Sequence, residues 1–260
     1  MKFFTCFALL YILLFSSCNQ ALKKESNQEP MLIVSDSLSP NQKWMDAINT
    51  KDINILENLY TENPYVLSIN GVDISNRDSL LNAVSTSNFK VTDVKTINRI
   101  KANEDYDYEI GSFKNKDGVE VKSIIIWKRT DSIDLRELEF LAETSNSSVD
   151  FKIIDSQRTE WMRLCNKHNA SNLIEAMYTK NTMYYNRGRL LHGRVALIQE
   201  YDYMNDPQYQ LTLQPITIES ISESLIYELG QCSGSYNGKY ILVWQKNQEG
   251  VWQIMFDSNI

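Results

Sequence analysis

The sequence predicts an α+β protein built from two similar domains in tandem. Short motifs recur at a nearly constant offset of 117 to 119 residues: Trp44-Met45 returns as Trp161-Met162, and Tyr108-Glu109-Ile110-Gly111 returns as Tyr227-Glu228-Leu229-Gly230. An offset of this size indicates a duplicated domain, because solenoid repeats are only about 20 to 50 residues long. In each copy helical periodicity comes first and strand alternation follows, which is the order of an α+β domain with an antiparallel sheet.

The amino terminus has the pattern of a secretory signal peptide. Lys2 precedes the apolar run Phe3–Phe15, which is shorter than the roughly 20 residues that a transmembrane helix needs. The next residues, Ser16-Ser17-Cys18, resemble the lipobox of bacterial lipoproteins, in which that cysteine becomes the acylated first residue. We therefore expect residues 1–17 to be removed and Cys18 to carry a lipid anchor. An ordinary secreted protein is the alternative.

Composition agrees with an exported, folded chain. The hydrophobic content is 43%, and the 26 basic and 33 acidic residues become 25 and 33 once Lys2 leaves with the signal. An acidic chain without a cluster of Lys and Arg repels phosphate backbones, so nucleic acid is not an expected partner. In some bacteria a dense acidic run after the lipidated cysteine directs a lipoprotein to the outside, and no such run follows Cys18. We therefore expect a location in the bacterial cell envelope, on the outer membrane and facing the periplasm.

The predicted first domain covers residues 39–144 and follows a polar tether at 18–38 without periodicity. Ser39-Pro40 predicts the start of its first helix, because Ser is a good N-cap and Pro suits the first helical position. A short second helix and a third helix are expected near 55–59 and 75–84. Strands are expected at 65–69, 89–99, 106–113, 119–129 and 135–142.

The predicted second domain covers residues 150–260, after a polar linker at 144–148. Helices are expected at 156–167, 171–178 and 194–204, and strands at 183–186, 209–219, 224–232, 238–246 and 251–257. Because each copy has its own helices and strands, we expect the second domain to fold without the first.

The chain resembles a known superfamily. Its element order, the Met177-Tyr178-Thr179 step before a short strand and the closing hairpin with Trp244-Gln245-Lys246 and Trp252-Gln253-Ile254 are similar to nuclear transport factor 2-like proteins, and within them to the SnoaL-like group. The resemblance extends over both copies. It implies two cone-shaped domains, each a curved antiparallel sheet wrapped around about three N-terminal helices, with a pocket between the concave face and the first helix.

The resemblance also allows a test for ketosteroid isomerase chemistry. Those enzymes need a tyrosine on the first helix, a carboxylate on the first strand and a protonated aspartate on a later strand. The matching residues are Trp161, Asn186 and Leu242 in the second copy, and Trp44, Ser68 and Ile125 in the first. These side chains cannot carry out that proton transfer, so we favour a protein without catalytic activity.

Two residues remain as candidate catalytic groups. Asp257 lies on the last strand, where some SnoaL-like cyclases are understood to place an acid or base, and alternation puts it on one face with Met255 and Gln253. If that face lines the pocket, desolvation raises the pKa of Asp257. Its expected counterpart in the first copy is Phe140, so the first domain would lack the group. His192, before the third helix, is a weaker candidate base.

The predicted function is binding of a small apolar or amphipathic molecule by the second domain. The candidate binding residues are Trp161, Tyr185, Asn186, Tyr201 and Trp244, and core packing is the alternative role for the aromatic ones. Two other functions stay open: a SnoaL-like isomerase, cyclase or dehydratase that uses Asp257, and an interaction module whose pockets are filled by its own side chains.

No cofactor or metal is expected. The two histidines are not spaced as metal ligands, and dinucleotide, phosphate-loop and nucleophile-elbow motifs are missing from the sequence. Cys165 and Cys232 either pair as a disulfide or remain free thiols.

Overall fold

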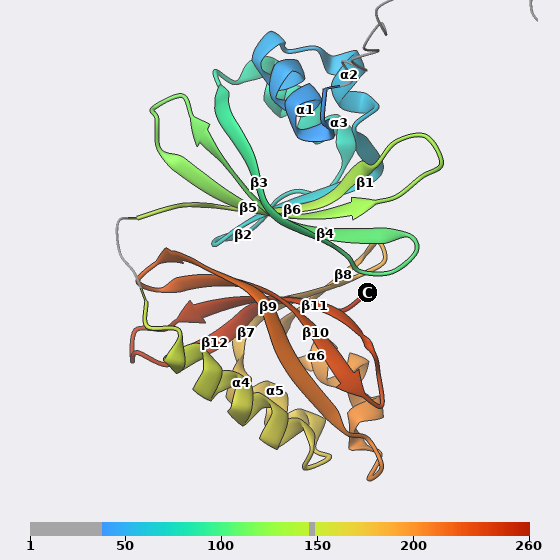
Figure 1. The fold of residues 1–260 in the computed structure, drawn as a ribbon, viewed down its shortest axis with the longest axis vertical. Helices are drawn as coiled ribbons and strands as arrows, with labels where there is room; N and C mark the ends of the chain where they lie inside the picture. The colour runs from blue at the N-terminus through green and yellow to red at the C-terminus, as the bar shows by residue number, and fades with distance from the viewer. Residues whose placement is uncertain (1–37, 146–148) are drawn as a thin grey trace, which may run out of the picture. The chain divides into compact units, whose positions relative to one another are not determined.

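The computed structural model describes residues 38–145 and 149–260, called here the first half and the second half (Figure 1). The predicted signal peptide, Cys18 and most of the tether lie outside the described residues, so the expectations about them stay predictions. Within these two ranges no helix is long and apolar enough to cross a membrane.

Three helices and six strands make up the first half. In chain order they are α1 Pro40–Thr50, α2 Ile53–Glu57, β1 Tyr60–Ser68, β2 Gly71–Ile74, α3 Arg77–Thr86, β3 Val91–Lys101, β4 Tyr106–Asn115, β5 Glu120–Lys128 and β6 Leu135–Glu143.

The second half repeats this order and adds a short 3₁₀ helix, η1. Its elements are α4 Lys152–Cys165, α5 Ala170–Met177, β7 Tyr178–Asn186, β8 Arg189–His192, α6 Gly193–Glu200, η1 Asp202–Asn205, β9 Leu211–Ser222, β10 Leu225–Gly234, β11 Gly238–Lys246 and β12 Trp252–Ser258.

The start of α1 follows the sequence signal closely. Ser39 Oγ accepts the backbone N–H of Gln42 at 3.2 Å, and the Gln42 side chain accepts the Ser39 backbone N–H at 3.2 Å, which completes a capping box. Trp44, Ala47 and Ile48 then lie buried on one face of the helix, because residues three and four apart share a face.

Both sheets have the same strand order, β2-β1-β6-β5-β4-β3 and β8-β7-β12-β11-β10-β9. Neighbouring strands are antiparallel except for β1 with β6 and β7 with β12, which are parallel. The α+β class with helices preceding each sheet is confirmed, but the sheets are mixed rather than wholly antiparallel. The parallel pairs matter for the site, because they bring the last strand of each half beside the first.

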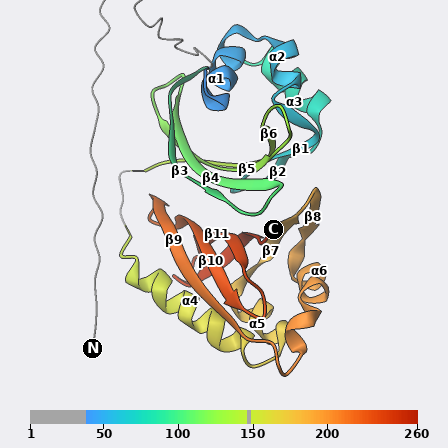
Figure 2. The ribbon, with the colours of Figure 1, turned by 45° about the vertical axis from the view of Figure 1, so that its right-hand side comes forward.

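Helices cover one face of the sheet in each half (Figure 1), and the sheet curls toward them (Figure 2). The sequence missed β2 and β8, which are too short to show a period. The turn into β8 uses left-handed backbone at Arg187 (φ 47°) and Gly188 (φ 82°), as a tight hairpin requires. The predicted helix 194–204 ends at Glu200 and continues only as η1.

Three buried apolar clusters hold the described residues together. One lies between helices and sheet in the first half and one in the second half. The third contains side chains of both sheets: the Phe140 ring lies 5.8 Å from Tyr227 and 5.8 Å from Phe256. Because separation of the halves would expose this third cluster to water, each half stabilises the other. Independent folding of residues 150–260 therefore stays a prediction, and the shared cluster argues against it.

Candidate functional site

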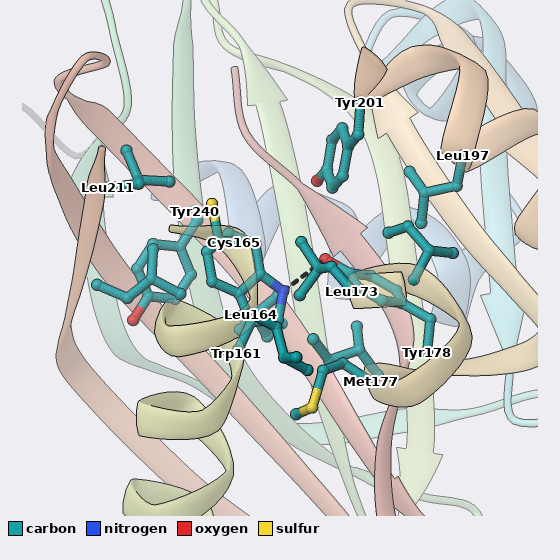
Figure 3. Close-up of a cluster of buried hydrophobic side chains, with 14 of the residues drawn as sticks. Trp161, Leu164, Cys165, Leu173, Met177, Tyr178, Leu197, Tyr201, Leu211 and Tyr240 are labelled. Atoms are coloured by element: carbon teal, nitrogen blue, oxygen red, sulfur yellow. Dashed lines mark hydrogen bonds between the residues drawn. The ribbon is translucent and has the colours of Figure 1, made fainter. Parts of the chain in front are cut away.

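A chain of hydrogen bonds in the second half ends on Asp257. The indole N–H of Trp161 on α4 donates to the Tyr178 hydroxyl at 3.0 Å (Figure 3), and that hydroxyl donates to Oδ2 of Asp257 at 2.7 Å. Tyr201, just after α6, donates to the same oxygen at 2.7 Å. Asp257 is 3% exposed, and burial raises its pKa to about 6 although both hydroxyls act to lower it.

Glu139 is the counterpart of Asp257 in the first half. Trp44 on α1 donates to the Tyr60 hydroxyl at 2.7 Å, and Tyr60 donates to Oε1 of Glu139 at 2.8 Å. Alignment of the two copies matched Asp257 with Phe140, which left the first domain without this carboxylate. That alignment is wrong by one residue. The structure places an equivalent buried acid in each half.

A β-bulge explains why the predicted face of Asp257 is also wrong. The register of β12 against β11 shifts between Ile254 and Phe256, which leaves Met255 as the extra residue. Met255 and Phe256 both join the cluster shared by the two sheets, whereas Asp257 points to the helix side. A bulge reverses the alternation beyond it, so Asp257 does not share a face with Met255 as the strand pattern of Gln253 to Asp257 predicted.

A buried cation distinguishes the two acids. Arg136 is 3% exposed and donates to Oε1 of Glu139 at 2.5 Å and to Oδ1 of Asn41 at 2.5 Å. Its guanidinium lies 4.3 Å from the ring centroid of Trp44, within cation–π distance. Within the described ranges, no Lys or Arg forms an ion pair with Asp257.

Each half buries a second carboxylate that the sequence analysis missed. In the second half Glu228 accepts from Arg158 at 2.7 and 3.0 Å, from Tyr240 at 2.7 Å and from the Trp244 indole at 2.9 Å. Trp244, predicted to bind a ligand, is fully buried and engaged in this network.

The first-half counterpart is Glu109, which accepts from the Trp127 indole at 2.8 Å and from Asn41 at 2.7 Å. One signal could have revealed this pair of acids. Glu109 and Glu228 occupy the same place in the repeated Tyr-Glu-Ile-Gly and Tyr-Glu-Leu-Gly motifs. A charged residue that both copies retain between apolar neighbours indicates a buried partner.

An apolar cavity of about 270 Å³ lies beside Glu139 in the first half. Its walls come from the helices and strands around Trp44, Leu80, Val84 and Phe89. Among the described residues that line it, Glu139 is the only charged one. The cavity thus combines apolar walls with one fixed acid, which suits recognition of a small molecule.

Tyr201 fills the matching space in the second half. Leu80 and Leu197 are both buried and share the repeat offset of 117, and the same offset aligns Val84 with Tyr201. The Tyr201 ring packs edge-on against Tyr184 at 5.4 Å and reaches Asp257 with its hydroxyl. Valine is too short to reach the acid, so the space beside Glu139 remains open.

The other predicted site residues separate in the structure. Trp161 and Tyr201 are buried in the second-half core. Tyr185 belongs instead to the cluster shared by the sheets, and its hydroxyl bonds to Glu137, so its predicted role in the cone is wrong. Asn186 lines a separate hollow together with Tyr184 and Tyr203. His192 is exposed at the N-cap of α6 and forms no side-chain capping bond.

Cys165 and Cys232 are free and buried. Burial raises the pKa of the Cys165 thiol to about 12, which disfavours the reactive thiolate. Across residues 38–145 and 149–260, no three His, Cys, Asp or Glu side chains come together as a metal site would require.

Comparisons with known proteins give structural likenesses only. No family model matches the chain, and no curated protein matches it. An NTF2-like protein from Cytophaga hutchinsonii is 15% identical with a TM-score of 0.35, and the match covers 40% of this chain and 92% of that protein. A DUF4783 family protein from Bacteroides uniformis is 10% identical with a TM-score of 0.34, covering 40% and 97%.

An NTF2-like protein of unknown function in nutrient uptake from Rhodospirillum rubrum is 15% identical with a TM-score of 0.35, covering 41% of this chain and 96% of that protein. Each likeness spans about as much chain as one half. The solved structures that this chain is similar to thus include nuclear transport factor 2-like proteins, the superfamily that the sequence resembles.

Proposed function

We propose that the first half binds a small, largely apolar molecule in the cavity beside Glu139. The observation that carries this proposal is the open space of about 270 Å³ where the second half places Tyr201. Both hydrogen bonds of Glu139 to Tyr60 and Arg136 use Oε1. Its Oε2 can therefore accept a hydrogen bond from a hydroxyl or amine at the polar end of the ligand.

This proposed binding site lies in the first half, whereas the sequence analysis predicted a site in the second half. In the second half the apolar space holds Tyr201, whose hydroxyl bonds to the buried Asp257, so the ring lies where a substrate would have to approach the acid. We therefore favour binding without catalysis over an enzyme that uses Asp257. The filled second cone fits the other alternative, a half whose role is structural.

Val84→Tyr is expected to abolish binding of an apolar fluorescent probe such as anilinonaphthalene sulfonate. The new ring occupies the cavity as Tyr201 does in the second half, and its hydroxyl can donate to Glu139. Stability should change by less than about 2 kcal/mol, because the ring enters existing space rather than a filled core. Probe fluorescence against protein concentration measures the binding, and urea unfolding measures the stability.

Val195→Tyr is the matched control, because Val195 lies on α6 and is 74% exposed. It adds the same ring at an exposed position outside the residues that line the cavity, and it should leave probe binding unchanged. If Val84→Tyr does not fold, Ala83→Leu fills the same cavity with a smaller side chain. Full probe binding by a folded Val84→Tyr or Ala83→Leu protein would refute the proposal.

We also infer that the protein is a lipoprotein held on a membrane by acyl chains on Cys18. The lipobox-like Ser16-Ser17-Cys18 supports this inference. Cys18→Ser should move the protein from the membrane fraction to the soluble fraction, because the acyl chains supply the apolar area for anchoring. Cys6→Ser, within the same signal peptide, is the control and should stay in the membrane fraction. Membrane retention of Cys18→Ser would contradict the inference, and fractionation followed by immunoblotting decides it.

A further inference from the structure

A second and chemically different concavity opens in the second half. This tyrosine hollow, of about 370 Å³, lies among β7, the α6–η1 segment, the β10–β11 turn and the carboxyl terminus. Four of its nine lining residues are tyrosines, and the others are two Asn, one Ser, one Arg and one Glu. None of these described lining residues is aliphatic. Such walls offer little to a hydrocarbon chain, in contrast to the first-half cavity.

The floor of the tyrosine hollow is held in place by hydrogen bonds. Tyr184 is 2% exposed, and its hydroxyl donates to the amide oxygen of Asn259 and accepts from Nδ2 of Asn186 at 3.3 Å. The Asn186 amide keeps its oxygen, and the Asn259 amide, which also contacts the Tyr203 hydroxyl, keeps one N–H donor. The floor therefore presents a donor and an acceptor with fixed positions, which lowers the entropic cost of binding a polar ligand.

Tyrosine rings form the walls above this floor. Tyr203 and Tyr236 are 47% and 36% exposed, so their rings are accessible from solvent. Tyr203 is fixed by edge-on contacts with Tyr209 at 5.4 Å and with Tyr201 at 5.9 Å. The face of an aromatic ring carries negative potential, and it attracts C–H groups that are polarised by neighbouring oxygens.

Charged groups complete the rim. Glu200 lies 2.7 and 2.6 Å from the guanidinium of Arg189, which holds its carboxylate in place. Glu200 and Arg187 both line the hollow, so the walls contribute one negative and one positive side chain. The carboxylate accepts hydrogen bonds and the guanidinium donates them, so both can bind hydroxyl groups.

We propose that the tyrosine hollow binds a saccharide, with one pyranose ring seated among the tyrosines. A pyranose combines a face of polarised C–H groups, which matches the rings of Tyr203 and Tyr236, with hydroxyls that both donate and accept, which match Asn186, Asn259 and Glu200. An acidic sugar would place its carboxylate near Arg187. This site is separate from the first-half cavity in position and in chemistry.

The test uses the full-length chain and a panel of methyl glycosides: glucose, galactose, N-acetylglucosamine and glucuronic acid. Saturation-transfer NMR should detect at least one of them, and calorimetry should give a saturating isotherm with a Kd below about 10 mM. A preference for the glucuronide would indicate an acidic sugar and a role for Arg187. Equal or weaker binding of the glucuronide would indicate that the site takes a neutral sugar.

Tyr236→Ala and Asn186→Ala should each weaken the binding roughly tenfold or more, with circular dichroism unchanged. Phe151→Ala is the matched control, because Phe151 is an aromatic residue outside the hollow with a similar exposure of 37%. Val84→Tyr should also bind the sugar normally, which separates this proposal from the one about the first half. The proposal would be overturned if no sugar of the panel binds the folded protein, or if Tyr236→Ala and Asn186→Ala bind the sugar as tightly as the unchanged protein does.

Discussion

Arg136→Met is expected to lower the free energy of unfolding by about 3–5 kcal/mol. Arg136 is 3% exposed and supplies the charge next to Glu139, and its other branch bonds to Asn41. Methionine keeps much of the volume but leaves an acid that is only 2% exposed without its cation. A buried, unpaired charge costs more than the salt bridge contributed, so the loss exceeds that of an ordinary surface mutation. Urea unfolding at neutral pH measures the difference.

Arg163→Met provides the comparison, because Arg163 pairs with Glu160 on the solvent side of α4 and its side chain is 48% exposed. Its loss should change stability by less than about 1 kcal/mol. The double variant Arg136→Met with Glu139→Gln should recover part of the loss, since it removes both charges together. A cost below about 1 kcal/mol for Arg136→Met alone would show that water reaches Glu139 and that the network is not buried in solution.

The sequence predicted the elements whose pattern is local. Trp44, Ala47 and Ile48 gave the spacing of α1, and Ser39 with Pro40 gave its start. The internal repeat then carried the same order to the second half. The sequence could not reveal which distant segments pair. The parallel partner of β1 is β6 and that of β7 is β12, and each lies at the other end of its half of the chain. Pairing of this kind depends on tertiary contacts rather than on a period.

The candidate site was only partly predictable for the same reason. Asp257 could be chosen as an acid on the last strand, and the expected rise in its pKa agrees with the structure. Desolvation is the cause in both cases, but it comes from burial beneath Tyr201 rather than from the walls of an open pocket. Neither the bulge at Met255 nor the hydroxyl of Tyr178, 79 residues away in the chain, has a signature in the strand pattern.

The two halves differ most in how they treat one buried acid. Glu139 has a cation and an open cavity, whereas Asp257 is 3% exposed and is covered by two tyrosine hydroxyls. Removing the charge should therefore have opposite effects in the two halves. Glu139→Gln should destabilise the protein at neutral pH, because it leaves Arg136 buried without its anionic partner.

Asp257→Asn should instead stabilise the protein at neutral pH, by about 2–3 kcal/mol. Burial raises the pKa of Asp257 to about 6 from an ordinary value of 3.8, so between these pH values the folded state binds more protons than the unfolded state. Stability contributed by the protonated acid is thus present below about pH 4 and is lost as the pH rises through about 6. Asparagine has no charge to desolvate and keeps an oxygen for the hydroxyls of Tyr178 and Tyr201. Urea unfolding at pH 4, 5, 6 and 7 should show a gain that grows with pH and is smallest at pH 4. A loss of stability at pH 7 would mean that the hydroxyls favour the carboxylate more than burial opposes it.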